Sequence, residues 1–254
     1  MVDQGSDEQI SYVNIFNEMG GDWEAIVNAR QTQKETNLIE NVVDSKGTIL
    51  DLCCGTGRHS MILARKGWNM IGLDLSKNLL TIAKQNMQRE GVNFPLVRGD
   101  MRHLPFRNQV FSAVLCMFTS FGYLSSEKED MISLREVRRT LRTNGKFLLD
   151  VINRDHLAKI FQEKDWAEYQ TFYMLERREL DLETSKMLSH WTIIRKGSGE
   201  IRTLLHKLRL YPLQKVQKMV PRARLRMIKV YGGYEKQEFN SDCSRLIVLA
   251  ERLD

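Results

Sequence analysis

The sequence predicts an α/β fold, in which helices cover both faces of a doubly wound, mainly parallel sheet. Three observations carry this prediction. Short apolar runs alternate with helical patterns between residues 48 and 151, which is the order typical of a parallel sheet. The run at 111–117 is apolar along most of its length, as in strands that are buried on both faces. After Tyr169 the pattern changes to three segments that indicate consecutive antiparallel strands.

The elements of the sheet are expected in a regular order. Two helical segments are expected before the first strand. One spans residues 10–27 and is interrupted at Gly20–Gly21, and the other spans residues 38–43. Strands are then expected at 48–52, 68–73, 92–97, 111–117 and 146–151. The intervening helices are expected to begin after Gly57, after Ser76 and after Ser125 or Ser126, and to end near Gly67, Gly91 and Arg142.

The second half of the chain adds an antiparallel unit and two further strands. The antiparallel strands are expected at 172–181, 186–195 and 201–210. A short helix should begin near Pro212, because proline suits the first turn of a helix. The last strands are expected at 225–231 and 245–250.

Composition narrows the class of protein. The chain has 254 residues, of which 42% are hydrophobic and 28% charged, as expected for one soluble globular domain with an insertion. It contains no run of about 18 apolar residues, so no membrane-spanning helix is expected. The polar segment Met1–Gln9 does not resemble a secretory signal. The spacing of the cysteines predicts reduced thiols in a cytoplasmic protein and no metal site; they are Cys53, Cys54, Cys116 and Cys243.

The stretch Ile49–Ser60 predicts a binding site for a polar ligand. An apolar strand leads to Asp51, the chain turns at Gly55 and Gly57, and a helix follows. Backbone N–H groups at such a turn bind anionic groups, and glycine permits the turn at low energetic cost. The carboxylate of Asp51 would repel a pyrophosphate but attract a positively charged group, so it argues against a dinucleotide. The third glycine of the dinucleotide fingerprint G-x-G-x-x-G is also replaced, by Ser60.

Two more acidic residues at strand ends complete the predicted ligand. Asp74 ends the second strand, where an acidic side chain accepts hydrogen bonds from ribose hydroxyls. Asp100 follows the third strand, where it can accept a hydrogen bond from an adenine amino group. The ligand is therefore expected to contain adenosine.

With these motifs, residues Ile49 to Val151 resemble the class I S-adenosylmethionine-dependent methyltransferases. The resemblance implies a Rossmann-like, seven-stranded mixed sheet with its last strand antiparallel. Cys53 stands where many members have glycine, and the block Phe118–Leu124 resembles a subgroup with a β-insertion after strand five. The implied organisation is a single domain, 1–254, with a helical cover at 1–45 and a β-insertion at 169–211 above the active site. The implied cofactor is S-adenosyl-L-methionine.

The resemblance also implies site residues. Those expected to bind the cofactor are Tyr12, Asp51, Cys53, Gly55, Gly57, Arg58, Asp74, Leu75, Asp100, Met101, Met117 and Phe118. Those expected near the substrate are Thr119, Tyr123, Asn153 and Arg154. Methyl transfer is an in-line displacement that depends mainly on alignment, and a base is needed only where the nucleophile arrives protonated. No catalytic residue is therefore assigned, and His59 is expected to make local contacts.

The methyl acceptor remains open at this point. A small molecule is favoured because the insertion is placed to cover the active site. RNA or protein is the alternative, because residues 195–236 carry twelve lysines and arginines against only Glu200 and Glu235. A non-enzymatic cofactor-binding module is a third reading and a dehydrogenase a fourth. The oligomeric state and the accepting atom do not follow from the sequence.

Overall fold

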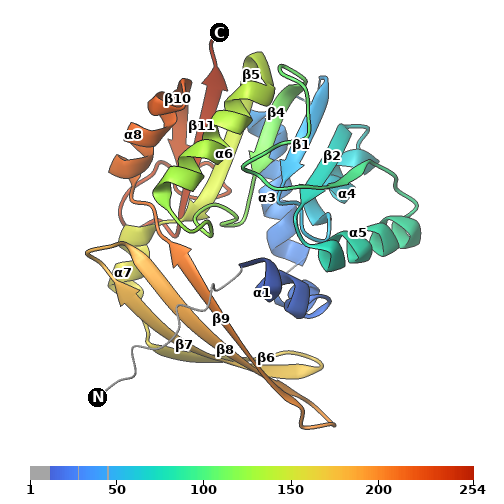
Figure 1. Ribbon diagram of the computed structural model, residues 1–254, viewed down its shortest axis with the longest axis vertical. Coiled ribbons are helices and arrows are strands. Elements are labelled where there is room, and N and C mark those ends of the chain that lie inside the picture. The colour runs from blue at the N-terminus through green and yellow to red at the C-terminus, as the bar shows by residue number, and fades with distance from the viewer. Residues whose placement is uncertain (1–11, 28, 45) are drawn as a thin grey trace.

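The computed structural model describes residues 12–27, 29–44 and 46–254, and it contains a seven-stranded and a four-stranded sheet (Figure 1). The larger sheet has the order β10-β11-β5-β4-β1-β2-β3. Its strands are β1 Thr48–Leu52, β2 Asn69–Asp74, β3 Leu96–Arg98, β4 Phe111–Cys116, β5 Leu141–Ile152, β10 Leu225–Tyr231 and β11 Arg245–Arg252. Strand β11 runs antiparallel to both of its neighbours, and β1 to β5 are parallel. The predicted mixed sheet with an antiparallel last strand is confirmed.

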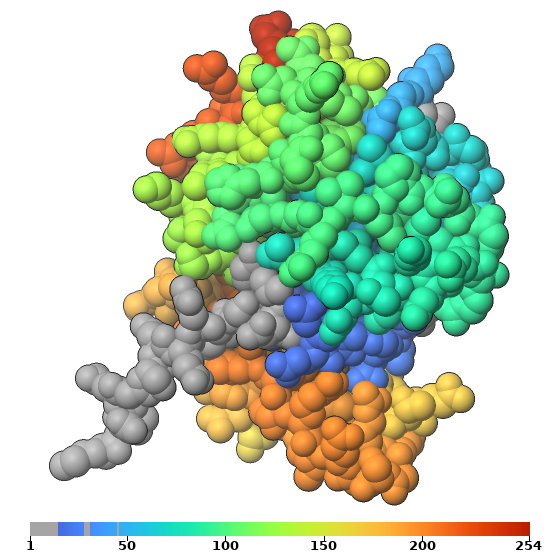
Figure 2. Space-filling model, turned by 45° about the vertical axis from the view of Figure 1, so that its right-hand side comes forward, coloured from blue at the N-terminus to red at the C-terminus, as the bar shows by residue number. Residues whose placement is uncertain are grey.

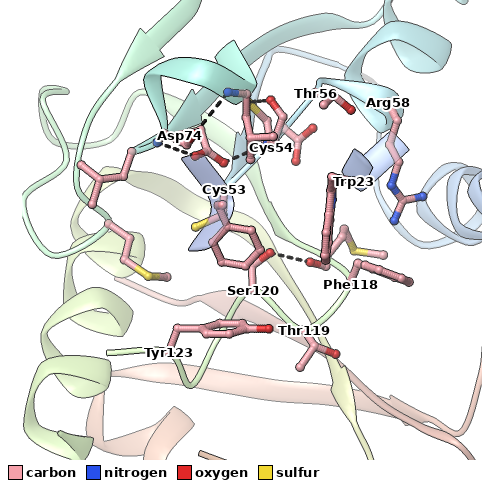
Figure 3. Close-up of a pocket in the computed structure, with 18 of the residues that line it drawn as sticks. Trp23, Cys53, Cys54, Thr56, Arg58, Asp74, Phe118, Thr119, Ser120 and Tyr123 are labelled. Atoms are coloured by element: carbon pink, nitrogen blue, oxygen red, sulfur yellow. Dashed lines mark hydrogen bonds between the residues drawn. The ribbon is translucent and has the colours of Figure 1, made fainter. Parts of the chain in front are cut away.

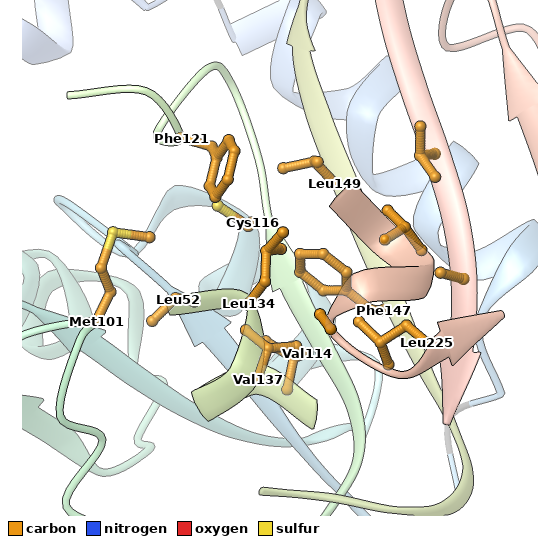
Figure 4. Close-up of a cluster of buried hydrophobic side chains, with 14 of the residues drawn as sticks. Leu52, Met101, Val114, Cys116, Phe121, Leu134, Val137, Phe147, Leu149 and Leu225 are labelled. Atoms are coloured by element: carbon orange, nitrogen blue, oxygen red, sulfur yellow. The ribbon is translucent and has the colours of Figure 1, made fainter. Parts of the chain in front are cut away.

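Helices cover both faces of this sheet. They are α3 Ala29–Val42, α4 Arg58–Arg65, α5 Lys77–Glu90, α6 Glu127–Thr140 and α8 Leu213–Arg222, and the short α7 Arg154–Ile160 leads into the second sheet. Alternate residues of the buried strands point to opposite faces, so Leu50 packs with α6 and α8 while Ile49 packs with α3 and α4. Figure 4 shows the first of these clusters, in which Val137 meets Val114.

The helix ends follow the predicted signals. The hydroxyl of Ser76 accepts a hydrogen bond from the Leu79 N–H at the start of α5, and Ser126 caps α6 in the same way. Gly91 ends α5 in the left-handed region, and Gly67 follows α4 with a positive φ. These are the conformations that favour glycine after a helix.

The four-stranded sheet is the predicted β-insertion, with one strand more than expected. It has the order β6-β7-β8-β9, formed by Lys164–Glu168, Phe172–Asp181, Lys186–Arg195 and Ile201–Arg209, all antiparallel. The sheet therefore begins at residue 164, before the expected 169. Strand β6 gave no signal because it is an exposed edge strand whose sequence, Lys-Asp-Trp-Ala-Glu, lacks an apolar face.

Other strand boundaries differ from the expected ones. Strand β5 begins at Leu141 rather than at 146, because residues on both sides of the Asn144–Gly145 turn are extended. Strand β3 is shorter than 92–97, since its ladder with β2 covers only three residues. Both differences concern the ends of strands, and they leave the topology of the sheet unchanged.

Two short helices lie between the sheets, α1 Tyr12–Met19 and α2 Asp22–Ile26. Figure 2 shows this segment in blue between the main sheet and the orange insertion. The Ser76 hydroxyl donates to the Asn17 side chain (2.6 Å), and Arg195 and Arg202 of the insertion form ion pairs with Asp22. The segment is therefore attached to both sheets. Within the described part of the chain, no helix is long and apolar enough to cross a membrane.

Candidate active site

A pocket of about 900 Å³ opens at the carboxyl ends of β1, β2 and β4 (Figure 3). This is where α/β sheets bind their ligands. One end of the pocket, here called the glycine-turn end, is formed by Asp51, Gly55 and Asp74. The other, the aromatic end, is formed by Phe16, Trp23, Phe118 and Tyr123.

The glycine turn follows β1 and has an unusual backbone. Cys53, Gly55 and Gly57 all have positive φ angles, of 62°, 57° and 78°. Glycine adopts such angles without steric cost, whereas a cysteine does so under strain. The positive φ explains why glycine is common at this position in the family that the sequence resembles, and it is strained for Cys53. Gly57 begins α4, and a Cβ there would press on Phe94 at 3.3 Å, so this glycine serves packing rather than the pocket lining.

Asp51 and Asp74 bring two buried carboxyl groups to the glycine-turn end. Asp51 accepts a hydrogen bond from the Ser60 hydroxyl at 2.7 Å, and Asp74 accepts the N–H groups of Gly55 and Ser76 at 2.9 and 2.8 Å. Burial raises the pKa of both groups above the ordinary value of an aspartate. Within the described residues neither carboxylate has an ion-pair partner. A cationic or hydroxyl-bearing ligand would therefore compensate this end.

A buried ionic cluster contacts residues that line the pocket near the same end. Glu35 of α3 accepts hydrogen bonds from Arg58 and lies 2.7 Å from Nε2 of His59, both of which line the pocket. Burial alone would raise the pKa of Glu35, but His59 and Arg58 outweigh it and lower the pKa to about 2. His59 therefore makes local contacts, as predicted, and its Nε2 is occupied by Glu35.

Four aromatic rings in edge-to-face contact form the aromatic end. The ring centroids of Phe16 and Trp23 lie 5.4 Å apart, those of Phe16 and Tyr123 lie 5.3 Å apart, and those of Trp23 and Phe118 lie 6.3 Å apart. The guanidinium of Arg58 lies 4.8 Å from the Phe118 ring centroid. Such contacts are favourable and hold the rings in fixed orientations. This end therefore presents a wall of aromatic faces to a ligand.

The turn after β4 is held by hydrogen bonds to Asp150. Phe118 and Thr119 both have positive φ angles, 54° and 62°, which are strained for these residue types. The Phe118 N–H donates to the Asp150 carboxylate (2.9 Å), and the Thr119 N–H donates to the Asp150 carbonyl (2.8 Å). Arg245 donates to both the Asp150 carboxylate and the Thr119 hydroxyl. Strands β5 and β11 thus fix a turn that belongs to β4.

The structure brings together most of the residues expected in the site. The lining includes Asp51, Cys53, Gly55, Arg58, Asp74, Leu75, Met101, Met117, Phe118, Thr119 and Tyr123. Residues that the sequence analysis did not assign also line it, namely Phe16, Trp23, Cys54, Thr56, Ser76, Leu79, Ser120 and Leu124. Phe16 and Trp23 gave no signal because they lie within α1 and α2, whose sequences carry no motif. Tyr12 lies in α1, but its side chain is outside the described residues.

Besides Gly57, three expected residues are placed away from this lining. Asp100 follows β3, and its carboxylate accepts four hydrogen bonds from Arg102, which lower its pKa although burial acts to raise it. Asn153 is fully buried and caps α7, where its amide donates to the carbonyls of Asn240 and Cys243. The third, Arg154, contacts other residues outside the pocket. Ligand contacts of these three stay predictions.

Half of the basic side chains in the stretch 195–236 are paired with acidic side chains within the protein. Its residues with acidic partners are Arg195, Lys196, Arg202, Arg209, Lys215 and Arg226. Half of the twelve basic side chains counted in the sequence therefore neutralise acids of the same chain. Across the described ranges, no group of three or more histidine, cysteine or acidic side chains is placed to hold a metal ion.

Comparison with known proteins agrees with this geometry. Residues 49–145 match the family model described as a methyltransferase domain. The glycine/sarcosine N-methyltransferase of Aphanothece halophytica is 24% identical over 255 residues, which cover 96% of this chain and 91% of that protein. The family model ends at residue 145, before the insertion, whereas the match to this relative covers most of the chain.

Solved structures share the whole architecture. The CcbJ methyltransferase from Streptomyces caelestis has a TM-score of 0.81 at 17% identity, covering 93% of this chain and 96% of that one. CalS10 from Micromonospora echinaspora, an amino pentose methyltransferase solved with S-adenosylmethionine bound, has a TM-score of 0.68 at 17% identity, covering 91% and 96%. The chain therefore shares the fold of these solved methyltransferases, and its residues 49–145 match the methyltransferase domain, in agreement with the resemblance that its motifs predicted.

Proposed function

We propose that this protein transfers a methyl group from S-adenosyl-L-methionine to an amino group of a small molecule in the cytoplasm. The single observation that carries the proposal is the composition of one continuous pocket. Two buried carboxylates without ion-pair partners among the described residues lie at one end, and four aromatic rings lie at the other. The first end suits the donor, and the second suits a cationic or weakly polar acceptor.

The residues of the glycine-turn end fit the proposed donor. Asp74 can accept hydrogen bonds from ribose hydroxyls, because each of its oxygens has only one backbone donor and each can accept another. Asp51 can attract the ammonium group of the methionine portion, and the backbone N–H groups of the turn can meet its carboxylate. Leu75 and Met101 supply apolar surface for the adenine. When bound, the sulfonium supplies an activated methyl group.

The aromatic end favours an amine as acceptor. Aromatic faces attract cations, so they can draw in an ammonium group, while burial away from water favours its neutral, nucleophilic form. The rings of Tyr123, Phe16, Trp23 and Phe118 are half-buried and in contact with one another, so they offer aromatic faces and shield this end partly from water. The relatives whose names give an acceptor, glycine or sarcosine and an amino pentose, support the same class.

The chain's own residues contribute mainly alignment. Positioning of this kind can supply roughly 7–11 kcal/mol of the lowering of the barrier. The Asp150 and Arg245 hydrogen bonds fix Phe118 and Thr119 at the junction of the two ends. His59, whose Nε2 is occupied by Glu35, is not assigned as a base. The amine is instead expected to lose its proton to solvent before the pocket closes around it.

Binding of the donor is the first test. In calorimetry, wild-type protein should bind S-adenosylmethionine, and Asp74→Ala should weaken that binding by about 100-fold, because two hydrogen bonds to a charged group are lost. The matched control is Asp44→Ala, which removes an exposed aspartate from a surface turn and should bind as the wild type does. Wild-type protein that does not bind the donor would refute the proposal.

Transfer is the second test. Labelled S-adenosylmethionine should mark small amines in a cell extract separated into small molecules, RNA and protein. Label found only in RNA or protein would favour the alternative acceptors. Donor binding without any transfer would favour a cofactor-binding module instead of an enzyme.

A further inference from the structure

The inner face of the β-insertion carries a band of polar side chains between two apolar clusters. One cluster contains Phe172, Ile193 and Leu204, and the other contains Met187 and Leu208. Between them, Glu176 lies opposite Trp191, and Ser189 lies opposite Arg178 in β7 and His206 in β9. Arg178 is paired with Glu176 and donates a hydrogen bond to the Gln162 carbonyl. Buried polar side chains normally have hydrogen-bond partners, so we expect each side chain of this band to have one.

Part of this band has hydrogen-bonding capacity that the described chain leaves unused. The indole N–H of Trp191 donates to Glu176 at 2.8 Å, so that pair is satisfied. Ser189 is 0% exposed and His206 is 4% exposed, yet the Ser189 hydroxyl and Nδ1 of His206 have no hydrogen-bond partner among the described residues. Directly opposite residues have Cβ atoms about 5 Å apart, so one small group could meet both side chains.

This unused pair lies next to the aromatic end of the pocket. The His206 ring lies between two aromatic rings, with centroids 4.3 Å from Trp191 and 5.9 Å from Tyr123. Tyr123 lines the pocket on the side nearest the insertion (Figure 3). Its ring is stacked on His206 at an interplanar angle of 28°. A single side chain therefore separates the pocket from the polar pair.

The chemistry of the pair selects the kind of group that it binds. Burial, together with the charge of His190, lowers the pKa of His206 to about 4, so its imidazole is neutral at neutral pH. A neutral imidazole offers one donor and one acceptor, and a serine hydroxyl can act as either. A hydroxyl group likewise donates and accepts at once, and it is less costly to bury than a charged group.

We propose that Ser189 and His206 form a subsite for a hydroxyl group of the methyl acceptor, reached when the Tyr123 ring turns aside. The acceptor is then a hydroxylated amine, whose amino group stays at the aromatic end. This inference rests on the proposed function and narrows its substrate class. It also gives the insertion a direct part in recognition.

The test compares two amines that differ by one hydroxyl, trans-4-aminocyclohexanol and cyclohexylamine. Their binding is measured by calorimetry on protein saturated with S-adenosylhomocysteine, so that the result does not depend on turnover. The wild type should bind the aminocyclohexanol about tenfold more tightly, the effect of one buried hydrogen-bonded group. His206→Phe keeps the ring stacking but removes both nitrogens, and it should abolish the preference while leaving the affinity for cyclohexylamine within about twofold.

Two further variants complete the test. Ser189→Ala should reduce the same preference without replacing the imidazole. The control is His190→Phe. His190 lies beside Ser189 in β8, on the opposite face of the sheet, so this substitution should leave the preference intact. A wild type that shows no preference, whether it binds both amines equally or neither, overturns the subsite. So does a preference that survives in both His206→Phe and Ser189→Ala. Failure of the proposed function is seen separately, as absence of donor binding.

Discussion

The two ends of the pocket are formed by different kinds of residue, which come from different parts of the chain. At the glycine-turn end, the positive φ angles of Cys53 and Gly55 and two strand-end carboxylates define the surface, all within residues 51–74. At the aromatic end, the four rings come from α1, α2 and the segment after β4, and the insertion lies behind them. A short stretch of sequence therefore suffices for one end, whereas the other exists only in the folded chain.

The largest effect is expected for substitution of Gly122, which should disturb the aromatic end and leave the glycine-turn end intact. Its φ is 108°, and a Cβ there would lie 2.3 Å from the Arg209 carbonyl, where β9 meets the loop that carries Tyr123. Gly122→Ala should lower the free energy of unfolding by roughly 3 kcal/mol and impair acceptor binding. If the two ends are independent, the affinity for S-adenosylmethionine measured by calorimetry should change less than threefold. A threefold change corresponds to about 0.6 kcal/mol of binding free energy.

Gly197 provides the control for backbone strain alone. Its φ is also positive, 86°, but no atom lies within 4 Å of the place that a Cβ would occupy. Gly197→Ala should cost only about 1 kcal/mol and leave both affinities unchanged. Equal effects of the two substitutions in urea unfolding would show that the contact with Arg209 is unimportant.

A smaller effect tests the ionic support of the glycine-turn end. Glu35→Gln removes the charge that pairs with Arg58 and His59, and it should cost about 2 kcal/mol at pH 7. Because the pKa of Glu35 is lowered in the folded protein, its stabilisation is present above the ordinary value of 4.5 and is lost as the pH falls toward about 2. The difference from wild type should therefore shrink below pH 4.5 in urea titrations.

The same helix supplies a matched control for Glu35. Glu40 pairs with Lys66 at the surface, where both side chains are partly exposed. Glu40→Gln should change stability by less than about 0.5 kcal/mol at any pH. A pH-independent cost of Glu35→Gln would mean that shape rather than charge matters at that position.

The smallest expected effect concerns Cys53. Replacing it with glycine relieves a left-handed cysteine, which costs roughly 1–2 kcal/mol, but it increases the entropy of the unfolded chain. Cys53→Gly should therefore raise the unfolding free energy by about 0.5 kcal/mol. Cys54→Gly should lower it, because Cys54 is buried against Gly72. Thermal unfolding of the two single variants compares them directly, and shifts of the same sign would contradict the strain at Cys53.

The comparison also shows what a sequence can reveal. Ser76, Gly67 and Gly91 were correctly assigned as helix ends because each acts on residues only a few positions away. The glycine turn was recognised for the same reason. Phe16 and Trp23 were not assigned, since their place in the pocket depends on contacts with Phe118 and Tyr123, about a hundred positions later. Such contacts follow from the tertiary fold and have no local pattern.

Asn153 shows that a polar residue after a strand can have a structural role as well. A polar residue that follows a sheet strand suggests a ligand contact, and for Asp74 the carboxylate does line the pocket. Asn153 instead uses its side chain to begin α7 and to hold two backbone carbonyls. The two roles produce the same residue types at the same kind of position, so only the direction of the side chain separates them.

The attachment of the four-stranded sheet has a consequence for how such enzymes diversify. The sheet meets the rest of the molecule through Gly122 and through Asp22, while the glycine turn is braced independently by Glu35. If the insertion recognises the acceptor as proposed, substitutions on its inner face should exchange one acceptor for another while the residues proposed to bind the methyl donor stay unchanged. The fold is in this respect a modular scaffold, and libraries aimed at new acceptors should be confined to that face.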